Sequence, residues 1–307
     1  PFRRVLSFAL VLPLAIPSYL ASYAFGEFLD FSGPVQTMIR SLFGYQTIRE
    51  YWFPDIRSLG GAVLVLASVL YPYVYLSVRA AFGLQGRQAA EAAKTLGATR
   101  LRIFLSVQLP MARPAIIIGL ALVMMETLND IGAVEYLGVP TLTFAIYETW
   151  LNRGNLAGAT QIASVLILIV AALVAIERMA RGRQRYAGTR STSMSRMAGL
   201  KPLSAGSRWL ATAFCALPVL CGFAVPVLVL GSYAARRLEA LSNPKFARAL
   251  AHSLEISASV ALVTLVCGFL FAYAQRVNTS PLARVASRIG SLGYGIPGTV
   301  LAIGVLL

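Results

Sequence analysis

The residues best placed for chemistry lie in one basic stretch, residues 79–113. Its fixed points are Glu91, Ala92, Ala93, Gly97, Val107, Leu109 and Pro110. The composition favours a helix from Gln85 to Leu96, which Gly97 is placed to end in a left-handed cap. Pro110 starts or bounds the next element. The pattern predicts a helix-turn-helix hairpin whose alanine-rich face enters a groove on a partner, and an ordinary amphipathic loop helix accounts for it equally well.

A second polar group, Glu126, Asn129 and Asp130, lies inside an apolar stretch. Glu126 is twelve residues into a candidate span that starts at Pro114, about 18 Å along a helix, where an ionisable side chain marks a pathway or a buried pair. Positions i, i+3 and i+4 share a helix face, so the three residues could line a cation route. A capping and anchoring cluster explains them equally well. No metal ligand set is assigned, and no cofactor is expected.

The composition sets the class of protein that must position these groups. Apolar residues make up 57% of the 307 residues and charged residues 13%, and the mean hydropathy is +0.70. These values indicate a membrane protein and exclude an ordinary soluble globule, a disordered chain and a disulfide scaffold. The net charge of +15 is typical of cytoplasmic loops that obey the positive-inside rule rather than of a nucleic-acid-binding face.

Seven stretches are long enough to span a bilayer, which takes about 20 apolar residues. They are Val5–Gly26, Ser58–Val78, Pro114–Ile131, Leu156–Ile176, Trp209–Tyr233, Ser253–Tyr273 and a truncated Ile289–Leu307. Unpaired backbone groups are costly in lipid, so the spans should be helices and the fold an all-α polytopic bundle. Internal prolines such as Pro13, Pro17 and Pro72 are expected to kink the spans.

The distribution of charge predicts the orientation of these spans. Nineteen basic residues and only two acids, Glu91 and Glu177, lie in four segments. The segments are Pro1–Arg4, Arg79–Arg113, Glu177–Arg208 and Gln275–Arg288. They are expected in the cytoplasm, and Gly26–Arg57 outside. Tyr51, Trp52, Trp150 and Trp209 should anchor span ends at the membrane interface, and His252 is expected to be an interfacial or capping residue.

The chain divides into two parts around a basic linker, residues 178–208, which is rich in Gly, Ser, Thr and Arg. At an offset of 280 residues the tail repeats seven residues of the start. They are Pro281, Arg284, Val285, Ser287, Leu292, Ile296 and Pro297. This indicates a parallel duplication. Residues 1–177 would hold the last four spans of the first repeat, and residues 209–307 the first three spans of a truncated second repeat. The sequence is therefore expected to be a fragment of a longer chain that has about twelve spans.

The hairpin motif resembles a known signature. The run E-A-A, three residues, G, nine residues, an aliphatic residue, one residue and L-P is similar to the signature loop of permease subunits of binding-protein-dependent ABC importers. The resemblance implies a coupling helix that docks into a cleft of the ATP-binding subunit. It also implies that Glu91, Ala92, Ala93 and Gly97 are the docking residues. Val107 stands where the family usually has isoleucine.

Longer stretches resemble one branch of that family, the fused double-permease subunits of ferric-iron importers. They are Leu12–Tyr23, Gly33–Gln36, Tyr71–Tyr75, Met125–Tyr147 and Tyr294–Gly304. The resemblance implies an inner-membrane permease that takes ferric ion from an external binding protein and moves it inward by alternating access, with two copies of a cytoplasmic ATPase. The fused permeases for thiamine and related solutes look similar over the same regions.

The absence of a phosphate-binding motif bears on the energy source. The sequence has no G-x-x-x-x-G-K-[ST] run, so the chain is expected to act as a transport subunit without ATPase activity of its own. The alternative from another class is a secondary transporter or channel driven directly by an ion gradient. A non-transporting membrane scaffold is the third interpretation.

Overall fold

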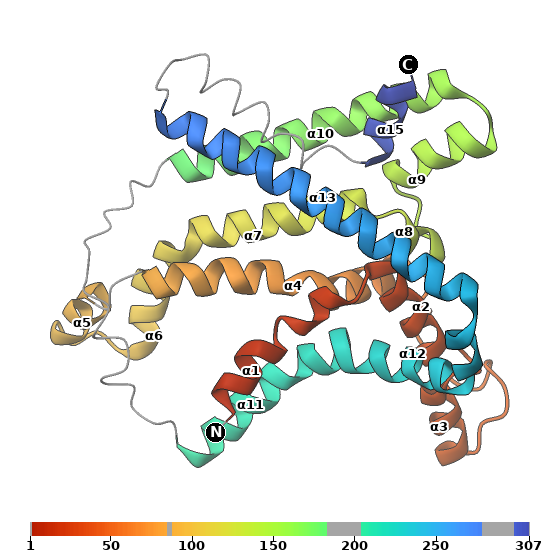
Figure 1. The fold of residues 1–307 in the computed structure, drawn as a ribbon. Helices are drawn as coiled ribbons and strands as arrows, with labels where there is room; N and C mark the ends of the chain where they lie inside the picture. Colours follow the sequence, from red (N-terminus) through yellow and green to blue (C-terminus); the bar gives the residue numbers. More distant parts are fainter. Residues whose placement is uncertain (1, 85–87, 183–203, 278–297, 307) are drawn as a thin grey trace. The chain divides into compact units, whose positions relative to one another are not determined.

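The computed structural model folds most of the chain into helices (Figure 1). The ranges that it describes are residues 2–84, 88–182, 204–277 and 298–306. The regular structure in these ranges is helical, which confirms the all-α prediction. Two compact units are present, one of Pro1–Val227 with Pro297–Leu307 and the other of Leu228–Ile296.

Within the described ranges, five helices are long and apolar enough to cross a membrane. They are Leu59–Gly83, Arg100–Asn129, Leu156–Ile176, Gly206–Arg236 and Pro244–Ala274. Each overlaps one of the predicted spans two to six. The predicted seventh span, Ile289–Leu307, lies mostly outside the described residues, which include from it only α15 (Gly298–Leu306). Residues 281–297 of the repeated tail also lie outside them, so the duplication stays a prediction.

The predicted first span, Val5–Gly26, is not one helix. α1 (Arg3–Ala9) and the 3₁₀ turn η1 (Leu12–Ala15) are followed by α2 (Ser18–Leu29), and a bend of 95° separates the two halves. Pro17 causes the break, because a proline pushes the preceding residue out of helical conformation. Ile16 is accordingly extended, with φ −102° and ψ 117°. The described residues carry six spans if this bent pair crosses the membrane as one.

Pro72 lies inside α4 (Leu59–Leu84) without interrupting it. A proline has no N–H, so it leaves the carbonyl of Ser68, four residues earlier, without its usual helical donor. Gly222 lies against that carbonyl so closely that a Cβ there would overlap the Ser68 oxygen. A glycine at the crossing lets the two backbones touch, as is common between helices in membranes.

Gly222 belongs to a π-helical turn, η5 (Leu220–Ala224), which joins α11 (Ala205–Val219) to α12 (Val225–Arg236). The Val225 N–H bonds to the Leu220 carbonyl, one residue beyond the α-helical partner. Pro226 follows directly, and the wider turn relieves the clash of its ring with the preceding turn. A π turn therefore precedes Pro226, one of the internal prolines of the predicted span Trp209–Tyr233.

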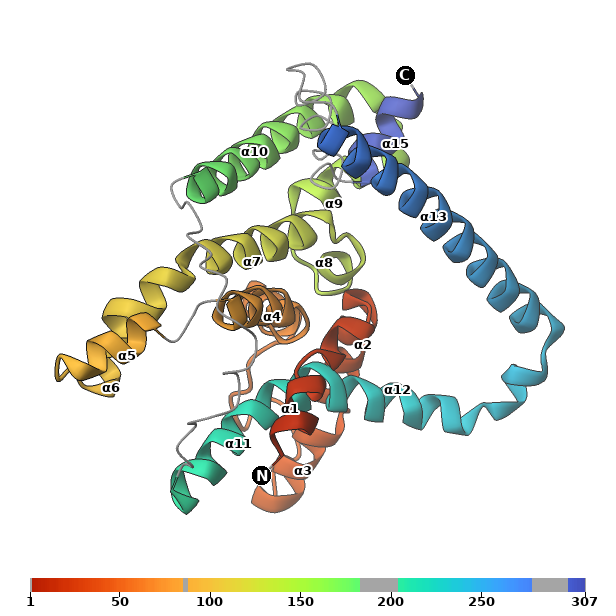
Figure 2. The same cartoon turned by 60° about the vertical axis from the view of Figure 1, so that its left-hand side comes forward.

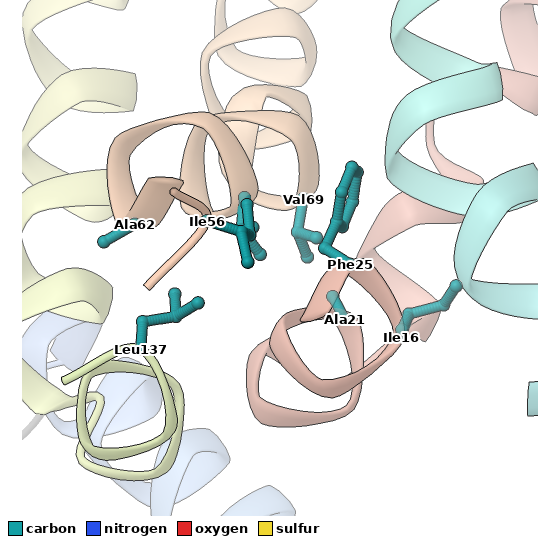
Figure 3. Packing of buried hydrophobic residues seen from close by; sticks show 8 residues of the cluster. Ile16, Ala21, Phe25, Ile56, Ala62, Val69 and Leu137 are labelled. Atoms are coloured by element: carbon teal, nitrogen blue, oxygen red, sulfur yellow. The ribbon is translucent and has the colours of Figure 1, made fainter. Parts of the chain in front are cut away.

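The core of the first unit lies where α2 crosses the start of α4. Figure 3 shows Phe25 and Ala21 of α2 beside Val69 of α4, and Ala62 of α4 on the side where Leu137 lies. α7 (Leu109–Asn129) packs along α4, and a Cβ at Gly119 would come within 2.6 Å of the Val74 Cα. Buried apolar contacts and close backbone crossings hold the helices together.

Short helices connect these spans at one end of the unit. They are α3 (Pro34–Phe43), α8 (Gly132–Tyr136), α9 (Leu142–Tyr147) and the π turn η3 (Glu148–Asn152). α10 (Leu156–Gly182) follows. It ends inside the predicted linker, residues 178–208. Linker residues 183–203 lie outside the described part of the chain.

The described part of the second unit consists of α12 from Leu228 onward, the 3₁₀ turn η6 (Leu238–Ser242) and α13 (Pro244–Val277). α13 has 34 residues and contains the predicted span Ser253–Tyr273. Asn243 begins it, since the Asn243 Oδ1 accepts a hydrogen bond from the Lys245 N–H at 2.9 Å. His252 is an exposed residue within α13, not a cap.

Candidate functional site

The stretch of residues 79–113 forms the predicted helical hairpin. α5 (Gln88–Thr95) is its first arm and α6 (Arg100–Ile103) begins the second. Both figures of the whole chain place α5 and α6 together at one end of α4 and α7, here called the hairpin end (Figures 1 and 2). The predicted start of the first arm, residues 85–87, lies outside the described residues.

Backbone hydrogen bonds close the first arm. The Ala98 N–H donates to the Ala93 carbonyl and the Gly97 N–H to the Lys94 carbonyl, each at 3.0 Å. Gly97 has φ +82°, the left-handed conformation that glycine adopts most easily. These two bonds are those of a Schellman motif, so the predicted left-handed cap at Gly97 is confirmed.

The second arm runs without a break into a membrane span. The Thr99 Oγ1 accepts a hydrogen bond from the Arg102 N–H and starts α6. A π turn, η2 (Phe104–Gln108), then joins α6 to α7. α7 begins one residue before Pro110, as predicted, but the chain does not leave helical conformation there. The Leu109 N–H reaches back to the Phe104 carbonyl, which opens the turn ahead of the proline ring.

The hairpin presents an exposed apolar and charged surface. Leu96 is 88% exposed and Leu101 67% exposed, whereas Ile103 is buried. Glu91, Ala92 and Gly97 are exposed, and Ala93 is half-buried. Val107, Leu109 and Pro110 are half-buried in the second arm. The seven motif residues therefore divide into an exposed part at the tip and a partly buried part where the second arm enters the span.

The second polar group lies at the other end of α7, here called the opposite end. Glu126 is half-buried, and the Asn129 Oδ1 is buried with no hydrogen-bond partner among the described residues. These two side chains share a face of α7. Asp130 does not continue that face, because it is extended, with ψ 118°, and ends the helix.

Asp130 caps the next helix. Its Oδ1 accepts a hydrogen bond from the Ala133 N–H at 2.9 Å at the start of α8. Beside it, the hydroxyl of buried Thr143 donates to the Leu128 carbonyl at the end of α7. Asp130 thus has the capping geometry of the second interpretation, and the pathway role of the three residues stays a prediction.

The described residues hold no group of three or more His, Cys, Asp and Glu side chains arranged to bind a metal ion. Glu126 and Asp130 are accordingly separate carboxylates at the end of α7. This end of the described chain holds a half-buried carboxylate, that of Glu126, on the same face of α7 as the buried amide oxygen of Asn129.

The sequence analysis missed α3, which it assigned to an external loop. Start and stop signals for this helix were present, since Pro34 follows Gly33 at its beginning and Gly44 follows its last residue. Gly44 has φ +75°, as a glycine after a helix often does. α8 and α9 carried weaker signals, the clearest being Thr141, whose hydroxyl caps α9 through the Phe144 N–H.

The chain matches proteins of known family. A family model described as "Binding-protein-dependent transport system inner membrane component" matches residues 1–185. The Fe(3+)-transport system permease protein FbpB 2 of Haemophilus influenzae is 25% identical over 301 residues, which are 97% of this chain and 54% of that protein.

Other relatives carry different solutes in their names. The sulfate transport system permease protein CysT of Salmonella typhimurium is 28% identical over 169 residues, 55% of this chain and 52% of that protein. The molybdenum transport system permease protein ModB of Escherichia coli is 28% identical over 195 residues, 61% of this chain and 82% of that protein. The chain spans about half the length of the iron and sulfate relatives. On the match over residues 1–185, this chain belongs to the inner membrane components of binding-protein-dependent transport systems.

Proposed function

We propose that this chain is a permease subunit of an ATP-driven importer and that the α5–α6 hairpin is the site where a separate ATPase subunit docks. The observation that carries the proposal is the continuity of the second arm with a span: α6, η2 and α7 form one helical run, Arg100–Asn129. A push on the hairpin tip is therefore transmitted along a helix about 45 Å long.

The surface of the hairpin suits a groove on another protein. Leu96 and Leu101 offer exposed apolar side chains, and exposed apolar surface often marks a site of protein–protein interaction. Glu91 stands with exposed Lys94, Arg100 and Arg102 around them, so the rim is mostly basic. Since the Schellman motif fixes the turn through its backbone, the tip has its shape before a partner binds.

In this proposal the hairpin end faces the cytoplasm, as the excess of basic residues requires, and the opposite end faces the external binding protein. ATP binding closes two copies of the ATPase subunit, each holding one docking hairpin. The two halves of the permease then rock, so that a central route opens alternately to each side. Glu126 and Asn129 line the outer part of that route.

Ferric ion is the proposed solute. Its support is the length of the match, because the iron-transport relative aligns with 97% of this chain and the molybdenum relative with 61%. A carboxylate in the route, Glu126, also suits a cation better than an oxyanion. Uptake of radioactive iron, molybdate, sulfate and thiamine by cells that carry the complete transporter tests this choice. Uptake of an oxyanion or thiamine without iron uptake would replace the solute and keep the docking site.

The docking proposal is tested with a pair of matched glycines. Gly97 and Gly154 both have positive φ, at 82° and 61°, and no neighbouring atom within 4 Å of a built Cβ. Valine costs about 1–2 kcal/mol of backbone strain at either position. Gly97→Val should reduce solute-stimulated ATP hydrolysis by about tenfold or more, as expected for a disrupted docking surface. Gly154→Val, at the opposite end, should leave it unchanged.

Charge reversal at Glu91 is a second test of the docking site. Glu91→Lys should lower recovery of the ATPase subunit in a pull-down without reducing the amount of folded permease. Glu135→Lys, an exposed carboxylate on α8, is its control. Normal pull-down and normal stimulation in both Gly97→Val and Glu91→Lys would contradict the docking site. Uptake that survives ATP depletion and collapses with the ion gradient would favour a secondary transporter instead.

A further inference from the structure

α3 is an amphipathic helix whose orientation is fixed by its own polar side chains. The buried Gln36 donates through Nε2 to the Leu29 carbonyl at 2.8 Å and accepts from the Tyr51 hydroxyl at 2.6 Å. Arg40 donates to the Phe31 carbonyl at 2.6 Å, with its guanidinium 3.9 Å from the centre of the Phe31 ring. These bonds hold one side of α3 against the turn after α2.

The exposed side of α3 is divided into two flanks. Met38 and Leu42 lie on one flank and are 57% and 72% exposed. Thr37 and Ser41 lie on the other and are also exposed. At 100° per residue the two flanks are about 100° apart. Because Gln36 and Arg40 fix the helix, it cannot roll to bury Met38 and Leu42 against the protein.

An aromatic row continues from the end of the helix. The rings of Phe43 and Tyr45 stack with centroids 5.9 Å apart, and those of Tyr45 and Tyr51 with centroids 5.3 Å apart. Phe43 is 68% exposed and Trp52, next to Tyr51, is 86% exposed. Tyrosine and tryptophan are the residues most typical of the membrane–water interface.

The position of α3 agrees with an interfacial location. It lies at the opposite end of the first unit, beyond the start of α4, and runs across the direction of α4 in both views (Figures 1 and 2). The bend of 95° before α2 turns this part of the chain away from the line of α1. A helix that leaves the span direction at the end of a bundle is placed to lie along the bilayer surface.

We propose that α3 and the aromatic row lie in the membrane interface at the opposite end, with Met38, Leu42, Phe43 and Trp52 inserted among the lipids and Thr37 and Ser41 facing water. The occupant of this surface is lipid of the leaflet at that end, which is the outer leaflet in the proposed topology. The surface is continuous with an established interface, since the chain is an inner membrane component and α4 exposes Leu59 and Val63 at the same end.

Lipid explains the division of the exposed side better than a protein partner does. A protein partner would need only the apolar flank. A helix in the membrane–water interface needs an apolar flank in the lipid and a polar flank in water, at the depth where tyrosine and tryptophan are enriched. α3 also carries no acidic residue.

Tryptophan quenching tests the proposal. These 307 residues hold three tryptophans, so Trp150→Phe with Trp209→Phe, together with phenylalanine at any tryptophan elsewhere in the complete permease, leaves Trp52 as the only reporter. The complete permease is placed in nanodiscs of lipid brominated either near the headgroup or near the chain end. Trp52 emission should be quenched at least about twofold more by the shallow bromines, and soluble iodide should quench it weakly.

A matched pair on the helix separates the two flanks. In a variant that also carries Trp52→Phe, Leu42→Trp should be quenched by shallow bromolipid and protected from iodide, and Ser41→Trp should show the reverse. Both sites are exposed, so neither change disturbs a buried contact.

Each remaining result would overturn the proposal. Full iodide access without bromolipid quenching would place α3 in water. Protection from both quenchers would mean that another part of the protein covers the surface. Protection from iodide that develops only when the external binding protein is added would assign the surface to that protein. None of these results bears on the docking hairpin, so failure here leaves the proposed function standing.

Discussion

The hairpin end and the opposite end of the first unit differ in how far side chains hold the backbone. In the hairpin the backbone closes on itself through the amides of Gly97 and Ala98, with one side-chain cap from Thr99. At the opposite end the backbone closes in the same way at Gly138, but side chains from other elements or turns also hold it, as Gln36 does at the end of α2 and Asp130 at the start of α8.

This difference predicts whether a substitution at each end alters coupling or stability. A tip whose turn is closed by its backbone keeps its shape when its exposed side chains change, so those side chains are available for a partner. An end held by buried polar side chains loses its shape when one of them is removed, because the carbonyl or amide that it served is left without a partner. Changes at the hairpin should therefore alter coupling, and changes at the opposite end should alter stability.

The largest expected effect on stability is at Thr143. Thr143→Val keeps the shape of the buried side chain but removes the hydroxyl that binds the Leu128 carbonyl. Leaving that carbonyl unsatisfied should cost about 1–3 kcal/mol. Thermal unfolding of the permease in detergent measures the loss. An unchanged unfolding temperature would show that this end does not depend on its side-chain bonds.

The next effect concerns transport through the opposite end. Glu126→Gln keeps shape and hydrogen bonding and removes the charge, so cation uptake should fall about tenfold at normal expression, which corresponds to a transport barrier higher by about 1.4 kcal/mol. Asp130→Asn is the control, because its amide oxygen can still accept from the Ala133 N–H. Wild-type uptake by Glu126→Gln would remove Glu126 from the route, and lost expression would favour a buried ion pair instead.

A smaller effect on stability is expected at the hairpin. Leu96→Ala and Leu101→Ala remove exposed side chains, so each should change the stability of the permease by less than about 0.5 kcal/mol. The same variants should weaken binding of the ATPase subunit, measured by titration in detergent. A large fall in unfolding temperature with unchanged binding would make the hairpin a structural element.

The smallest effect is a pH response of the loop after α3. Hydrogen bonds from the Gln46 N–H and the Thr47 hydroxyl lower the pKa of Glu50 from its ordinary value of 4.5. The ionised form is favoured in the fold, so its contribution is present above pH 4.5 and is lost as the pH falls through the lowered pKa. Trp52 emission should therefore shift in this acidic range, and Glu50→Gln should abolish the shift. A shift that persists in the variant would point to another group.

The spans and the hairpin could be predicted from sequence because they depend on local properties. Span length follows from runs of apolar residues, and the cap at Gly97 follows from the one residue type that adopts positive φ easily. The effect of each proline could not be predicted in the same way. Pro17 breaks its helix, whereas Pro72 does not interrupt α4, where Gly222 from a distant segment lies against the freed carbonyl of Ser68.

The opposite end was harder to predict for a related reason. Asp130 fits both a helix face and a cap on sequence grounds, and the choice depends on where the chain turns after Asn129. α3 has too few apolar residues to be predicted as a span. Its polar residues bind carbonyls of a neighbouring turn, and these bonds could not be predicted from the spacing of residues in the sequence. Such contacts are set by tertiary structure rather than by local pattern.

Cysteine cross-linking tests whether the hairpin docks on an ATPase subunit. In a complete permease whose native cysteines, Cys215, Cys221 and Cys267 among them, are replaced by alanine, Ala92→Cys should form a cross-link with the purified ATPase subunit. Gly154→Cys, which is equally exposed at the opposite end, should form none. Cross-linking at residue 92 that strengthens when ATP binds is the predicted result. Absence of cross-linking at residue 92 while the ATPase subunit still copurifies with the permease would contradict the account.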